Sequence, residues 1–145
     1  MFYPKDGWIN GIDLKLDEGA PEKRQHFIDF VENLLMVGKN RSSLKKFSLL
    51  FEVGKEFPRV NKWLNVFVNP MIEELNLELE RVEKPLVLPH QFFTSEKLTK
   101  FQLSMRQVIK IPSTINFKNH VTLTLKHVIF PSSYCAQEFF IGLRR

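Results

Sequence analysis

The sequence holds few of the residues on which redox, metal and phosphate chemistry depends. Its 145 residues include a single cysteine, Cys135, which excludes an internal disulfide and favours a reducing compartment. It has no glycine-rich loop of the kind that binds phosphates, and no apolar run approaches the roughly 20 residues of a membrane-spanning helix. We therefore predict a protein of the cytoplasm or nucleus that is not secreted, needs no cofactor and contacts no membrane.

Acidic residues are scarce in one part of the chain. Residues 97–145 carry eight Lys or Arg and one Asp or Glu, whereas residues 1–96 carry 13 and 15. A basic half is compatible with nucleic-acid binding, but no basic run alternates with aromatic residues, which favours a solvated basic face. A hydrophobic content of 43% is sufficient for a packed core, and the length predicts a single domain over residues 1–145.

The sequence does contain a short pattern of apolar residues that repeats along the chain, and we call each copy a phrase. Residues 44–49, 72–77 and 98–103 all read apolar-x-x-apolar-x-apolar, and residues 9–14 and 120–125 are weaker copies. The last four starts are separated by 28, 26 and 22 residues, which is in or near the range of leucine-rich repeats. Because repeats of this kind stack into a solenoid, the pattern predicts an extended binding surface rather than a catalytic cleft.

Each phrase is predicted to be a strand, with helices in the longer gaps. Residues 75–79 and 121–125 alternate as a strand does. Pro21 and Gly38 bracket one amphipathic helix, Pro58 and Pro70 bracket a second, and residues 134–143 are expected to begin a third. Strands joined by long crossovers are parallel. We predict an α/β fold, a truncated leucine-rich-repeat solenoid whose curved parallel sheet of about five strands is backed by helices and irregular segments.

The alternation divides the strand side chains between two faces. The apolar positions face the core, and the positions between them face outward on the concave side of the sheet. Asp13 and Lys15 belong to this outer face in the first strand. The residues predicted to form a protein-binding face on the other strands are Lys46, Ser48, Glu74, Asn76, Glu78, Lys100, Gln102, Ser104, Thr122, Thr124 and Lys126.

A series of ordered phrases carries a family resemblance over residues 8–142. SLKKFSL at 43–49 precedes RVNKWL at 59–64, and EELNL at 73–77 precedes PLVLPH at 85–90 and FFTSEKLT at 92–99. IPSTINF at 111–117 and LTL at 123–125 continue the series. In this order and with these gaps, the phrases resemble the leucine-rich region of plant F-box/LRR proteins of the FBD-associated type.

The resemblance implies a non-catalytic protein-interaction module, like the region that holds the target in an SCF-type ubiquitin-ligase receptor. In such receptors an F-box docks on the Skp adaptor. Residues 1–7 contain no F-box and residues 143–145 no FBD segment, so we expect no binding to Skp and a truncated relative of these receptors. The alternatives are a basic nucleic-acid-binding surface and a non-functional truncated paralogue.

Candidate catalytic and metal-binding residues do not form a recognisable site in the sequence. His120 and His127 bracket one predicted strand near Cys135, but their spacing matches no standard zinc pattern. Ser42 and Lys45 have a catalytic Ser-x-x-Lys spacing, yet its partner motifs are missing. We therefore predict no catalytic, cofactor-binding or metal-binding residue and no enzyme activity.

Four side chains receive structural roles. Glu74 and Glu78 are expected to share a face as part of a solvated acidic patch. Trp63 lies in the middle of a helical apolar stripe, which predicts burial in the core. His120 stands in a position that leucine or isoleucine occupies in the other phrases, so we expect it to be buried.

Overall fold

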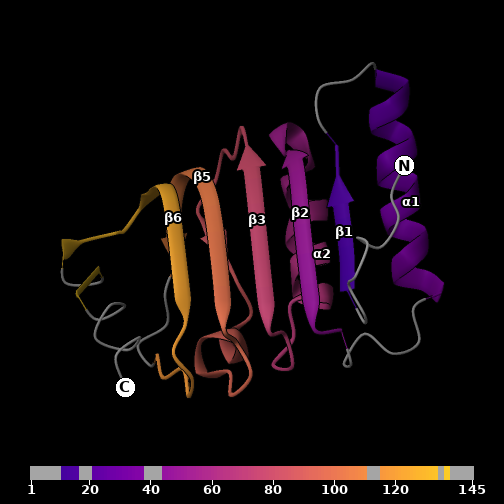
Figure 1. Cartoon of the computed structure of the whole chain (residues 1–145). Coiled ribbons are helices and arrows are strands. Elements are labelled where there is room, and N and C mark those ends of the chain that lie inside the picture. Colours follow the sequence, from indigo (N-terminus) through magenta and orange to yellow (C-terminus); the bar gives the residue numbers. More distant parts are fainter. Residues whose placement is uncertain (1–10, 17–20, 38–43, 111–114, 134–135, 138–145) are drawn as a thin grey trace.

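A parallel sheet dominates the fold. The computed structural model describes residues 11–16, 21–37, 44–110, 115–133 and 136–137. Five longer strands lie side by side in chain order, and every pairing between neighbours is parallel (Figure 1). These strands are β1 (Gly11–Lys15), β2 (Lys46–Glu52), β3 (Glu74–Glu80), β5 (Lys100–Lys110) and β6 (Thr122–Ile129). The predicted α/β class with a parallel sheet is therefore confirmed.

The phase of the repeated phrase sets the register of these strands. Gly11, Lys46, Glu74, Lys100 and Thr122 are the third residues of the five phrases, and they form one continuous row of paired positions. The apolar positions consequently pair with one another across the sheet. A one-residue slip would turn every apolar side chain to the wrong face, so burial of the apolar face holds this register.

Within the described part of the chain, the α-helices α1 and α2 accompany the sheet, and both match the sequence prediction. Helix α1 (Pro21–Val37) begins at the predicted proline, and α2 (Phe57–Phe67) has Pro58 in its first turn. Proline suits this place because the first N–H groups of a helix lack intrahelical partners. The 3₁₀ segment Gly54–Glu56 leads into α2, and a second one, His90–Thr94, precedes β5. In Figure 1, α2 passes behind β2 and α1 lies beyond β1.

Aromatic side chains fill the space between the helices and the sheet. Trp63 of α2 is fully buried, as predicted, and its ring lies 5.5 Å from that of Phe51 in β2. Phe27 of α1 stacks on Phe51 at 5.1 Å, so one cluster joins both helices to the sheet. A second cluster, in which the Phe92 and Phe101 rings lie 5.0 Å apart, fills the core behind β5.

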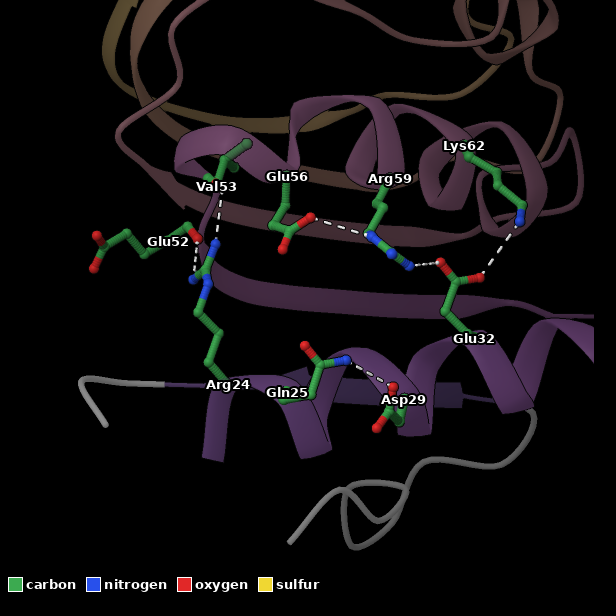
Figure 2. A network of polar contacts seen from close by, with 9 residues as sticks. All are labelled: Arg24, Gln25, Asp29, Glu32, Glu52, Val53, Glu56, Arg59 and Lys62. Carbon is green, nitrogen blue, oxygen red and sulfur yellow. Dashed lines mark hydrogen bonds and ion pairs between the residues drawn. The ribbon is translucent and has the colours of Figure 1, made fainter. Parts of the chain in front are cut away.

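A polar network fastens α1 to α2 and to the end of β2 (Figure 2). Glu32 of α1 accepts hydrogen bonds from Arg59 at 2.8 Å and from Lys62 at 3.4 Å, both on α2. Burial would raise the pKa of Glu32, but these bonds and the charge of Lys62 outweigh it and hold the pKa below its ordinary value. Arg24 donates to the carbonyl oxygens of Glu52 and Val53 at 2.7 and 2.9 Å, which satisfies two acceptors at the end of β2.

The structure departs from the sequence prediction at two places. A short strand, β4 (Leu86–Val87), pairs with the far end of β5 and makes a sixth strand, where the sequence predicted about five. His120 is exposed, so its predicted burial is wrong. It directly follows the bend at residues 118–119 that leads into β6, and Leu123 and Leu125 of this strand are only half-buried. Three parts of the predicted elements lie outside the described residues: residues 9–10 of the first phrase, the predicted helix end at Gly38, and residues 134–135 and 138–143 of the expected third helix.

Candidate functional site

One face of the sheet is polar and lies open among the described residues. Phe47 and Phe51 of β2 contact Phe67 and Trp63 of α2, so the odd-numbered residues of this strand face the helix. The even-numbered residues point to the opposite side, which is the uncovered near side of the sheet in Figure 1. We call this side the polar face.

The polar face carries the predicted residues in three rows that run across the strands. In the first row Lys46, Glu74, Lys100 and Thr122 are paired positions, and in the second Ser48, Asn76, Gln102 and Thr124 are. The third row joins Glu78, Ser104 and Lys126. Asp13 and Lys15 extend the second and third rows onto β1. The structure thus brings all eleven predicted residues together on one surface.

Two of the three charged side chains in the first row form an ion pair with each other. The Lys46 ammonium lies 3.0 Å from the Glu74 carboxylate, and both side chains are only about 30% exposed. Lys100, the next residue in the row, is exposed and makes no ion pair with any described residue. Exposed pairs contribute little because water screens them, so the Lys46–Glu74 pair mainly fixes the positions of its two side chains.

The second row is uncharged from β2 to β6. The Asn76 side-chain amide donates to the Ser48 hydroxyl at 3.2 Å, which links β2 to β3. Ser48 is 8% exposed and therefore lies at the bottom of the face. Asn76 and Gln102, beside each other on β3 and β5, are half-buried and present amides that both donate and accept hydrogen bonds.

Two shallow hollows lie on the polar face. A hollow of about 180 Å³ is lined by Ser48, Glu74, Lys100 and neighbouring residues. A second of about 140 Å³ is lined by Glu78, Ser104 and Lys126, among others. Asn76 and Gln102 line both, so the two hollows adjoin at the middle of the second row.

The polar face extends further along β2 and β3 than predicted. Leu50 pairs with Glu78, and Glu52 pairs with Glu80. The strict alternation along β3 was a sufficient signal for Glu80, whereas β2 has three apolar residues in succession at 49–51, so its sequence contained no such signal for Leu50. Arg81 folds back onto this end of the face, where its guanidinium lies 2.7 Å from the Glu52 carboxylate. Glu52 and Glu80 therefore make this end of the polar face more acidic than the part formed by the eleven predicted residues.

The described residues contain neither a candidate metal-binding group nor a helix suited to span a membrane. Among them, no group of three histidine, cysteine, aspartate or glutamate residues is arranged to hold a metal ion. His120 and His127 are both exposed, whereas Cys135 and Ser42 lie outside the described ranges. No helix in this part of the chain is long and apolar enough to cross a membrane.

The sequence is similar to parts of several plant F-box proteins. The chain is 32% identical over 108 residues to the F-box protein At3g59000 of Arabidopsis thaliana, which covers 70% of the chain and 22% of that protein. It is 34% identical over 93 residues to the F-box protein At3g03040, covering 62% and 19%, and 28% identical over 128 residues to the F-box/LRR-repeat protein At4g14096, covering 88% and 25%. The aligned part thus spans a quarter or less of each Arabidopsis relative. No family model and no solved structure matches the chain.

Proposed function

Because this chain is homologous to part of plant F-box and F-box/LRR-repeat proteins, we propose that it is a non-catalytic protein-interaction module. Its sheet is a segment of a leucine-rich-repeat solenoid, and its polar face binds a segment of a target protein. The observation that carries the proposal is the set of three aligned polar rows on the polar face, which lies open among the described residues, with both hollows on these rows.

Repeated backbone contacts support the solenoid part of this proposal. The residue before each strand accepts hydrogen bonds from the corresponding residues of the next repeat: Lys45 from Glu73 and Glu74, and Glu73 from Thr99 and Lys100. Two side chains at equivalent positions, Asn69 and Ser95, also donate to the preceding repeat, to the carbonyl oxygens of Leu44 and Pro70. Equivalent positions bonded to equivalent positions are what stacked repeats require.

The composition of the polar face supports a protein partner. Its amides, hydroxyls and charges of both signs are groups that bind the backbone and side chains of another chain. A cofactor or substrate pocket encloses most of its ligand in an apolar cleft, whereas these hollows are shallow and polar-lined. The proposal places target binding on the sheet and assigns no chemistry to any of its residues.

A displayed library of plant protein fragments tests the proposal, with the intact chain as bait. Replacing Asn76 and Gln102 by alanine should weaken captured fragments at least about ten-fold, because hydrogen bonds at the centre of an interface are the costly ones to lose. Gln25 and Asn33, exposed on α1, give a control variant of the same chemistry. Equal binding by both double variants, or no fragment captured by the unchanged chain, would refute a role for this face.

Ligase recruitment is a separate question. Target receptors of this class reach the ligase through an F-box, and residues 1–145 include no segment that resembles one. We therefore propose that this chain by itself holds a target without docking on the Skp adaptor, in the cytoplasm or nucleus. A pull-down with purified Skp adaptor should show no saturable binding, whereas micromolar binding would contradict this division of roles.

A further inference from the structure

Resting on the proposed function, we propose that the polar face is selective for an extended partner segment that carries two carboxylates four residues apart. The site is the trough formed by the two adjoining hollows. Lys100 lines one hollow and Lys126 lines the other, while Asn76 and Gln102 line both. The trough therefore has a lysine at each end and amides in its middle.

Both end lysines are available to a ligand. Lys100 and Lys126 are exposed, and neither makes an ion pair within the described part of the chain. Lys46, by contrast, is held by Glu74 at 3.0 Å. Ammonium groups at the rim of a hollow attract carboxylates and fix which part of a ligand lies where.

The distance between the lysines sets the spacing of the partner's carboxylates. Lys126 pairs with Ser104, four residues beyond Lys100 on β5. At about 3.3 Å per residue along a strand and about 4.8 Å between strands, their Cα atoms lie about 14 Å apart. An extended peptide spans about 13 Å between residues i and i+4, and alternation puts both side chains on the same side.

The middle of the trough matches a peptide backbone. The side-chain amide of Gln102 makes no hydrogen bond with the described residues, and that of Asn76 uses one donor on Ser48. The remaining donors and acceptors of these two amides fit the N–H and C=O groups of an extended chain. A strand-like peptide lying along β5 would present such groups over this row of amides.

Glu78 argues against a polyanion in the same place. It is exposed on β3, lines the second hollow opposite Lys126 and has no partner among the described residues. An uninterrupted run of phosphates or carboxylates would pass close to this charge and to Glu74, and like charges repel. The trough therefore favours two separate carboxylates with an uncharged or basic centre over a nucleic-acid strand.

A library of displayed twelve-residue peptides, selected on the intact chain, tests the inference. We expect enriched peptides to carry Asp or Glu at positions i and i+4 more often than the unselected library does. Selection on a Glu78→Gln variant should also enrich peptides with a third carboxylate between the other two, because the charge that repels it is removed. If no peptide is enriched, the proposed function of this face fails; if peptides are enriched without the paired carboxylates, only the present inference fails.

Titration of one enriched peptide then tests each lysine. Lys100→Gln and Lys126→Gln should each weaken binding by up to about five-fold, the range of a solvent-exposed ion pair. Lys23→Gln on α1 removes the same charge from an exposed site elsewhere and should change affinity little. Equal affinity in all three variants, or tighter binding of a single-stranded oligonucleotide than of the peptide, would overturn the inference.

Discussion

Leu75→Ala tests the assignment of the two faces of the sheet. Leu75 is 1% exposed and lies in a row between Phe47 and Phe101. Truncation removes three carbon atoms from the core, which costs about 2.4 kcal/mol at about 0.8 kcal/mol for each methylene-sized group. A residual cavity of about 50 Å³ adds about 1.2 kcal/mol.

The change should therefore lower the free energy of unfolding by about 3.6 kcal/mol, within the range measured for buried leucines. Far-UV circular dichroism during urea unfolding measures this loss. For an m value near 2 kcal/mol per molar urea, the midpoint should fall by about 1.8 M. An m value equal to that of the unchanged protein would show that the unfolding transitions of the variant and of the unchanged protein can be compared directly.

Asn76→Ala is the matched control, because Asn76 follows Leu75 on β3 and points to the opposite face. It loses one hydrogen bond, from its amide to the Ser48 hydroxyl at 3.2 Å, and should cost about 1 kcal/mol or less. Losses of equal size in the two variants would refute the assignment of apolar positions to the core. A larger loss for Asn76 would mean that the strand register is wrong.

Three further predictions concern the ends and the helix contacts. Glu32→Gln should lower the free energy of unfolding by about 0.5–1 kcal/mol near neutral pH in thermal melts. Because the pKa of Glu32 is lowered on folding, the stability difference between this variant and the unchanged protein should shrink as the pH falls below about 4. A difference that stays the same at low pH would show that the ion pairs of Glu32 with Arg59 and Lys62 do not cause it. Arg24→Met should lower stability by about 2 kcal/mol in urea, since it leaves the Glu52 and Val53 carbonyls without their charged donor, and a neutral outcome would show that water replaces it. Sedimentation at micromolar concentration should show self-association through β6, where Leu123 and Leu125 are half-exposed and Ile129 is 51% exposed; a monomer that binds no hydrophobic dye contradicts this.

The sequence by itself determined the strands, their parallel arrangement and their register. The apolar phrase repeats in phase, so equivalent positions such as Lys46, Glu74 and Lys100 must align if the apolar positions between them are to be buried together. The same alternation placed every predicted residue on the polar face. The helix boundaries also followed from local signals, because prolines at positions 21, 58 and 70 act on the backbone whatever the tertiary context.

The tertiary structure decided which groups of that face are occupied and where it is hollow. Neither the pairing of Lys46 with Glu74 nor the absence of an ion-pair partner for Lys100 among the described residues is encoded in any local pattern, since each depends on side chains 26 to 28 residues away. The exposure of His120 and the pairing of β4 were missed for the same reason. A repeat fixes the phase of the backbone, whereas burial and charge pairing depend on what the crossovers place beside each residue, and these crossovers differ in length and content from one repeat to the next.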